Sequence, residues 1–185
     1  MSDLFIPSLP TAFADAVGSF FIFTDTIILT TVLKFKMEVY FIMNNFNDSP
    51  IEVKWRLIGD NNEYWNSSGC LYAYLHPKTY KILYIGKADG TTVKERWSAE
   101  DKDELWNCLN KNGIKKHIPI IGFVYLPELR RFSSELLKDI EGLLIYLEQP
   151  ICNINNKKTR GISRPGMIIK CSGEIWPGKE IYKDK

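Results

Sequence analysis

The sequence predicts an α+β domain whose sheet has three antiparallel strands flanked by helices, in the order β-β-α-β-α. Two segments, 70–76 and 80–86, are rich in tyrosine and large aliphatic residues, which is typical of strands. A third segment of this kind, 117–126, follows one helical segment and precedes another. The order of these segments gives the predicted architecture.

The first two strands are expected to form a hairpin. The segment between them, PKT at 77–79, is short and begins with proline, which favours a turn. Side chains two positions apart share one face of a strand, so Tyr72 and Tyr74 are expected to lie together on the first strand. For the same reason, Ile82 and Tyr84 are expected to share a face of the second strand. A hairpin brings these two faces together.

Capping residues mark where the first helical segment begins. Thr92 and Glu95 have the spacing of a capping box, so a helix is expected to start there. Arg96 would then lie in its second turn, near the ends of the two strands. Helical periodicity continues or restarts over 103–113, which closes with a glycine.

The last predicted helix begins near Ser133 and ends before Pro150. Its apolar residues recur at helical spacing and define a core-facing stripe: Leu136, Leu137, Ile140, Leu144 and Leu147. Glu141 lies at the edge of this stripe, where a charge needs a cation, a metal ion or a hydrogen-bond partner. The other carboxylates of this helix are expected to be solvated: Glu135, Asp139 and Glu148.

Composition indicates a folded protein with one core and a modest extension. The chain has 185 residues, of which 45% are hydrophobic and 25% are charged, a balance that argues against a disordered tail. A formal net charge of +2 is too small to indicate or exclude nucleic-acid binding. Any basic surface must therefore come from local clustering.

The cysteines and histidines do not predict a metal site. The four cysteines lie far apart without a C-x-x-C pair, and the only histidines are His76 and His117. In a chain with this much apolar core, the thiols are interpreted as packing residues of a reduced, cytoplasmic protein.

Residues 1–45 are predicted to be an N-terminal extension, and 46–68 a lead-in to the folded domain. The extension contains an apolar run, 17–36, that is interrupted by Asp25. A central carboxylate disfavours membrane insertion, so a strand hairpin or a poorly ordered segment is preferred over a membrane anchor. A further alternative is that the protein starts later, near Met37 or Met43.

Five residues of the predicted domain stand in an order that is hard to produce by chance. The tripeptide CLY at 70–72 is followed by YIG at 84–86 and by Arg96. The run EGLLIYLEQPICN then supplies Glu141 and Asn153. This pattern resembles the GIY-YIG nuclease superfamily, which includes the N-terminal nuclease domain of the bacterial excision-repair protein UvrC. YIG matches one name-giving tripeptide in full, whereas CLY keeps only the tyrosine of the other. The resemblance covers residues 69–156.

The resemblance implies a metal-dependent DNA endonuclease that hydrolyses phosphodiester bonds, of a repair, restriction or mobile-element type. Its catalytic residues would be Tyr72, Tyr84, Arg96, Glu141 and Asn153. Glu141 would bind one divalent ion, Mg²⁺ or Mn²⁺. Tyr72 would act as the general base or orient the water, and cations such as Arg96 and Lys87 would favour its phenolate.

The remaining residues of the implied site have supporting roles. Tyr84 would position the phosphate or the water, Gly86 and Lys87 would support phosphate binding, and Asn153 would orient the neighbouring network. Some relatives carry a histidine four residues after the arginine, where this sequence has Glu100.

DNA is the implied partner. The segment 157–170 follows the implied site and carries five basic residues and no acidic one. The residues predicted to contact phosphates are Lys157, Lys158, Arg160 and Arg164. A solvated basic extension over 157–185 is an equal alternative for this segment.

Two other functions stay open at this stage. One is a catalytically inactive GIY-YIG fold that serves as a DNA-binding or assembly module. The other is a membrane-tethered nuclease, which depends on residues 17–36.

Overall fold

The computed structural model describes residues 31–38, 49–59, 63–98, 103–128, 130–159, 161–173 and 175–184. The chain divides into two compact units, 1–46 and 47–185. In the first unit, residues 31–38 form a helix with exposed side chains. Most of the apolar run 17–36, with Asp25, lies outside the described residues. Among the described helices, none has the length and apolar character needed to cross a membrane.

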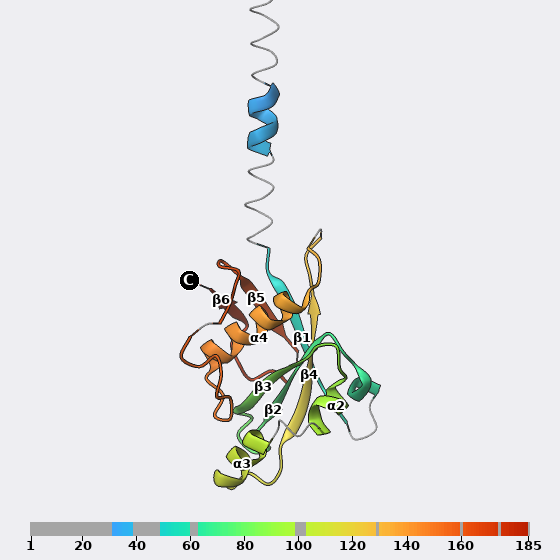
Figure 1. Cartoon of the computed structure of the whole chain (residues 1–185), viewed down its shortest axis with the longest axis vertical. Coiled ribbons are helices and arrows are strands. Elements are labelled where there is room, and N and C mark those ends of the chain that lie inside the picture. Colours follow the sequence, from blue (N-terminus) through green and yellow to red (C-terminus); the bar gives the residue numbers. More distant parts are fainter. Residues whose placement is uncertain are drawn as a thin grey trace, which may run out of the picture. The chain divides into compact units, whose positions relative to one another are not determined.

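The unit 47–185 is built on one six-stranded sheet (Figure 1). Its strands are β1 (Ile51–Leu57), β2 (Cys70–Leu75), β3 (Ile82–Ala88), β4 (Ile118–Tyr125), β5 (Ile168–Ser172) and β6 (Ile181–Lys183), in the order β3-β2-β4-β1-β5-β6. The pair β1 and β5 is parallel and the other pairs are antiparallel. The α+β class is therefore confirmed. The three-stranded antiparallel sheet is wrong, because the lead-in supplies β1 and the C-terminal extension supplies β5 and β6.

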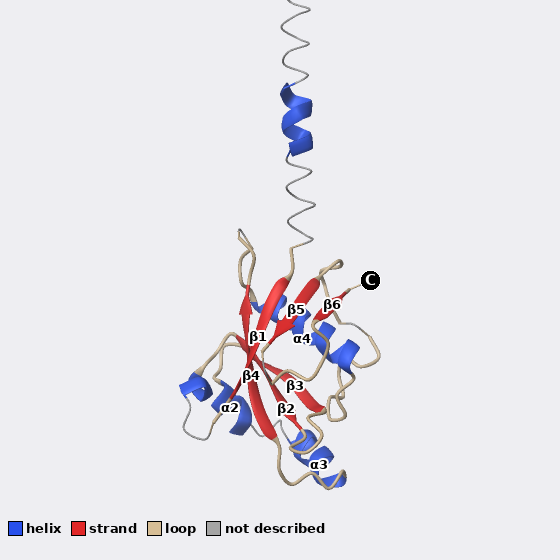
Figure 2. Ribbon diagram, turned by 180° about the vertical axis from the view of Figure 1, so that it is seen from behind, coloured by secondary structure: helices blue, strands red, loops and turns tan. Residues whose placement is uncertain are grey.

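Helices cover both faces of this sheet: α2 (Val93–Ser98), α3 (Asp103–Lys111), α4 (Ser134–Glu148) and the short 3₁₀ helix η1 (Glu63–Asn66). Helix α4 crosses in front of the strands in Figure 1 and lies behind them in Figure 2. Its apolar stripe packs on one face to form what we name the α4 core, which includes Val53, Leu71, Ile85, Leu137 and Ile140. The opposite face packs against α2 and α3 in the tyrosine core, which includes Tyr72, Tyr74, Val93, Leu105 and Leu109.

The predicted helix ends are confirmed. The Thr92 backbone N–H donates to the Glu95 carboxylate at 2.7 Å, and the Glu95 N–H donates to the Thr92 hydroxyl at 3.1 Å. This reciprocal pair is the predicted capping box. The Ser133 hydroxyl accepts from the backbone N–H of Leu136 at the start of α4. At its other end, Gln149 adopts a left-handed conformation before Pro150.

The predicted hairpin of β2 and β3 is confirmed, but its side-chain faces are only partly as expected. Tyr74 pairs with Tyr84 and Leu75 pairs with Ile82, so Leu83 is an additional residue in β3. This bulge shifts the alternation of the strand. Ile82 consequently packs against the α4 core, whereas Tyr84 packs against the tyrosine core.

Two expectations about polar side chains are wrong. Asp139 is fully buried rather than solvated, and it accepts hydrogen bonds from the Ser163 N–H at 2.9 Å and from Arg164 at 3.3 Å. Cys108 and Cys152 form a disulfide instead of serving as separate packing residues. Each correction depends on residues distant in sequence that the fold brings together. The other two cysteines, Cys70 and Cys171, are buried free thiols, as expected.

Candidate active site

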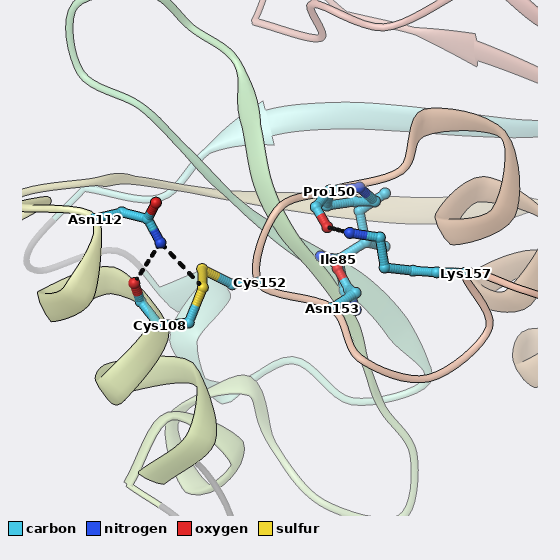
Figure 3. Close-up of a disulfide and its surroundings, with 7 residues drawn as sticks. All are labelled: Ile85, Cys108, Asn112, Pro150, Cys152, Asn153 and Lys157. Carbon is cyan, nitrogen blue, oxygen red and sulfur yellow. Dashed lines mark hydrogen bonds between the residues drawn. A yellow bond between two sulfur atoms is a disulfide. The ribbon is translucent and has the colours of Figure 1, made fainter.

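The candidate site lies along the outer edge of β3, the terminal strand of the sheet. The segment that follows α4 runs beside this edge. Its Cys152 N–H donates to the Leu83 carbonyl at 2.8 Å. The Asn153 amide then accepts from the Ile85 N–H at 2.9 Å and donates to the Ile85 carbonyl at 2.8 Å (Figure 3). Asn153 therefore satisfies both backbone groups of a residue at a strand edge.

Two cavities open at this edge, with volumes of about 270 and 280 Å³. Both are bounded by Tyr84, Arg96 and Glu141. These side chains come from β3, α2 and α4, respectively. Because β3 is an edge strand, helices on opposite faces of the sheet can both reach past it. The fold thus brings a phenol, a guanidinium and a carboxylate to one place.

Asn153 lines the first of these cavities. Four of the five predicted catalytic residues are therefore brought together at cavity walls. Tyr72 lies behind them: it is 1% exposed and does not line either cavity. Its ring centroid is 6.1 Å from that of Tyr84.

Gly86 makes room for the tyrosine pair. It stands opposite Tyr72 in the strand register. A Cβ atom at Gly86 would lie 2.6 Å from the Tyr72 hydroxyl and 2.8 Å from a ring carbon of Tyr84. Real Cβ contacts are not this short, so the two rings require a glycine here. This packing is a physical reason for the glycine of the YIG tripeptide.

Burial controls the protonation of Tyr72. Desolvation raises the pKa of Tyr72 far above its ordinary value, and Tyr84 and Tyr74 raise it further. Arg96 acts in the expected direction by lowering this pKa, but burial outweighs it. A hydrogen bond between the Tyr72 and Tyr84 side chains also favours the protonated form. Tyr72 is therefore a neutral phenol at neutral pH.

Lys87 lines the second cavity together with Asp89, a residue that sequence reasoning missed. The Lys87 ammonium donates to Asp89 at 2.8 Å, and the Ser134 hydroxyl donates to the other Asp89 oxygen at 3.0 Å. The hydrogen bond from Lys87 is the main cause that lowers the pKa of Asp89. Asp89 thus partly neutralises Lys87 and joins the end of β3 to the start of α4.

The carboxylate and amide oxygens that line the first cavity suit a hard divalent cation as ligands. Glu141 shares this cavity with Glu104 of α3 and with Asn155 and Asn156. Carboxylate and amide oxygens are ligands that suit Mg²⁺, which keeps several waters of its own. Across the described ranges, no three residues of the types His, Cys, Asp and Glu come together as a metal-binding group. A site of this kind would rely on Glu141 with few other protein ligands.

The disulfide joins two walls of the first cavity. Cys108 belongs to α3, which contributes Glu104 and Leu105 to the lining. Cys152 also lines the cavity and directly precedes Asn153, another lining residue; Figure 3 labels both. The sequence offers no local signal for this link, because 44 positions separate the two cysteines.

The basic residues predicted to contact DNA differ in their surroundings. The Lys157 ammonium donates to the Pro150 carbonyl at 2.9 Å (Figure 3). Arg164 forms its ion pair with the buried Asp139. Lys158 is exposed, and Arg160 lies outside the described residues. The contacts of Lys157 and Arg164 give both residues a structural role.

Scans against models of protein families, curated proteins and solved structures found no match for this chain.

Proposed function

We propose that this chain is a metal-dependent DNA endonuclease of the GIY-YIG type. One observation supports the proposal. Both cavities at the edge of β3 are lined by the same three side chains, Tyr84, Arg96 and Glu141, which come from three different elements. A phenol, a fixed positive charge and a carboxylate can position the water, offset charge on the phosphate and hold a metal ion, which are tasks in phosphodiester hydrolysis. Asn153 holds the edge of β3 in place beside them.

Arg96 and Tyr84 would bind the scissile phosphate. The guanidinium of Arg96 offers planar donors to the non-bridging oxygens and offsets their increasing charge in the transition state. The Tyr84 hydroxyl would donate a further hydrogen bond to the phosphate or to the attacking water. Tyr72 would hold the Tyr84 hydroxyl from behind, through the hydrogen bond between the two side chains. In this arrangement, Tyr72 orients Tyr84 as a neutral phenol.

Glu141 would hold the divalent ion, with Glu104 at the same cavity. When bound, such an ion promotes ionisation of a coordinated water and offsets negative charge on the leaving oxygen. In the hydrolysis, the water oxygen forms a bond to phosphorus and one phosphorus–oxygen ester bond breaks. The water loses a proton to solvent, and the leaving oxygen gains one.

We infer that DNA reaches this edge of the sheet. The exposed Lys158 is close in sequence to Asn153 and would contact a phosphate beyond the scissile one. The disulfide between Cys108 and Cys152 favours an oxidising compartment over the cytoplasm expected from the sequence, since such bonds are rare in reducing compartments. The activity should therefore be measured with and without a thiol reductant.

Cleavage of supercoiled plasmid tests the proposed function. The wild type is expected to produce nicked or linear DNA with Mg²⁺ or Mn²⁺ and no product with EDTA. Glu141→Gln keeps the shape of the side chain but removes its charge, and is expected to lower cleavage at least 100-fold. Glu128→Gln, at an exposed position, serves as the matched control and should cut like the wild type. Binding of diverse DNA substrates without cutting by the wild type would favour the inactive binding module.

A further inference from the structure

One hydroxyl of the tyrosine core lacks the hydrogen bond that burial normally demands. Tyr74 is 1% exposed. Among the described residues, none forms a hydrogen bond with its hydroxyl. A buried hydroxyl without a partner is unfavourable, and phenylalanine would fill nearly the same space without that cost. The hydroxyl therefore needs an explanation other than packing.

Tyr74 lies directly behind the candidate site. It stands opposite Tyr84 in the strand register, and the two rings are stacked with centroids 5.7 Å apart. Its ring also contacts Trp97 edge-on, with a centroid distance of 4.9 Å. Trp97 directly follows Arg96 in α2. Tyr74 therefore contacts Tyr84, which lines both cavities, and the residue next to Arg96, which also lines both.

The hydroxyl of Tyr74 is also coupled electrostatically to these two residues. Burial raises the pKa of Tyr74, Tyr84 raises it further, and Arg96 lowers it. Tyr74 consequently remains a neutral phenol at neutral pH, with a proton to donate. Tyr84 has two acceptor lone pairs, and the hydrogen bond with Tyr72 uses at most one of them.

We propose that Tyr74 is a positioning residue of this site: when phosphate binds and Tyr84 donates its own proton to a phosphate oxygen, the two tyrosine side chains shift so that the Tyr74 hydroxyl donates a hydrogen bond to the Tyr84 hydroxyl. This inference depends on the phosphate-binding role proposed above for Tyr84. A hydroxyl that donates a hydrogen bond becomes a better acceptor, because hydrogen bonds in a chain polarise one another. Tyr74 and Tyr72 would together hold Tyr84 in its phosphate-binding orientation.

Binding of inorganic phosphate, followed by tryptophan fluorescence, tests this role without any need for cleavage. The Tyr74→Phe variant removes only the hydroxyl and is expected to bind phosphate about 3- to 10-fold more weakly. In a double-mutant cycle, Tyr74→Phe with Tyr84→Phe should bind no more weakly than Tyr84→Phe alone. Additive losses would show that Tyr74 does not act through Tyr84, and would overturn the inference.

Tyr182→Phe provides a matched control. Tyr182 is also 1% exposed, but it belongs to the α4 core and its hydroxyl donates to Glu148. Its removal is expected to lower the unfolding temperature and leave phosphate affinity unchanged. Tyr74→Phe is expected to do the reverse, with an unfolding temperature equal to or above that of the wild type. A Tyr74→Phe variant that loses stability and keeps its phosphate affinity would assign the hydroxyl a structural role instead.

Parallel plasmid cleavage separates this inference from the proposed function. If the wild type binds phosphate but cuts no DNA, the nuclease proposal fails and the phosphate cycle still decides the role of Tyr74. If the wild type cuts DNA, Tyr74→Phe should lower the turnover rate by a similar 3- to 10-fold. Equal phosphate affinity in wild type and Tyr74→Phe, or no phosphate binding by either, overturns the inference.

Discussion

The side-chain amide of Asn153 forms two hydrogen bonds with the backbone of Ile85, one as acceptor and one as donor. Ile85 lies between Tyr84 and Gly86 at the edge of the sheet. The amide therefore fixes the strand that carries Tyr84 against the segment that closes the first cavity. An amide suits this task because it both donates and accepts in one plane.

Asn153→Ala is expected to lower both stability and activity. Removing the amide leaves two backbone groups of Ile85 without their partner, which should reduce the free energy of unfolding by about 1–3 kcal/mol. Urea denaturation measures this loss, and plasmid cleavage measures the effect on the site. The exposed Asn107→Ala should change stability by less than about 0.5 kcal/mol. If Asn153→Ala matched that control in both assays, the role assigned to this contact would be wrong.

Gly86→Ala is expected to abolish activity by displacing the tyrosine pair. The new Cβ would lie 2.6 Å from the Tyr72 hydroxyl and 2.8 Å from Tyr84, so one ring must move. Overpacking of this kind typically lowers the free energy of unfolding by about 1–3 kcal/mol. Gly59→Ala is the control, because nothing lies within 4 Å of its added Cβ. Urea denaturation and plasmid cleavage of both variants check the expectation, and a fully active Gly86→Ala would contradict it.

Loss of the disulfide is expected to destabilise the fold and loosen the first cavity. The bond between Cys108 and Cys152 closes a long loop, so its removal should lower the free energy of unfolding by about 2–4 kcal/mol. The double variant Cys108→Ser with Cys152→Ser and the reduced wild type should behave alike in urea denaturation. Cleavage should fall in both, because α3 would no longer be tied beside Asn153. Full stability and activity of the double variant would refute this expectation.

Local sequence signals predicted the parts of the fold that local contacts decide. The Thr92–Glu95 box, the Ser133 cap and the hairpin of β2 and β3 each depend on residues close in sequence. The grouping of Tyr84, Arg96, Glu141 and Asn153 was implied by the family resemblance and not by a local signal, and these four residues do line one cavity.

Contacts between distant segments could not be predicted in this way. The burial of Asp139 depends on Arg164, 25 positions later, and the disulfide spans 44 positions. The pairing of β1 with β5 likewise joins the lead-in to the C-terminal extension. The bulge at Leu83 moved Ile82 to the other face, because one additional residue breaks strict alternation. None of these features leaves a periodic pattern in the sequence.

The basic residues after the site are expected to separate into structural and DNA-binding groups. Arg164→Ala leaves the buried carboxylate of Asp139 without its ion-pair partner and should lower the free energy of unfolding by about 1–3 kcal/mol. Lys158→Ala should keep full stability, weaken DNA binding and reduce its dependence on salt. Urea denaturation and DNA binding at several salt concentrations measure the two effects. Equal behaviour of the two variants would contradict this division.

Alkaline pH is expected to destabilise the protein through its buried thiols and phenols. Burial raises the pKa of Cys70 and of Cys171 to about 12, and it also raises the pKa of Tyr74 and of Tyr182. In the unfolded chain, these groups release their protons near their ordinary pKa values, about 8.5 for cysteine and about 10 for tyrosine. Above those values the unfolded state binds fewer protons than the folded state, so stability falls as pH rises.

The expected slope can be measured one group at a time. Each group that is ionised only in the unfolded state should lower the free energy of unfolding by about 1.4 kcal/mol per pH unit. Urea denaturation between pH 8 and pH 11 should therefore show a decline that begins with the thiols and steepens when the tyrosines ionise. Tyr182→Phe removes one such group and should make the decline above about pH 10 less steep by about 1.4 kcal/mol per pH unit. Stability that stayed constant to pH 11 would show that these hydroxyls and thiols ionise as readily in the folded protein as in the unfolded chain.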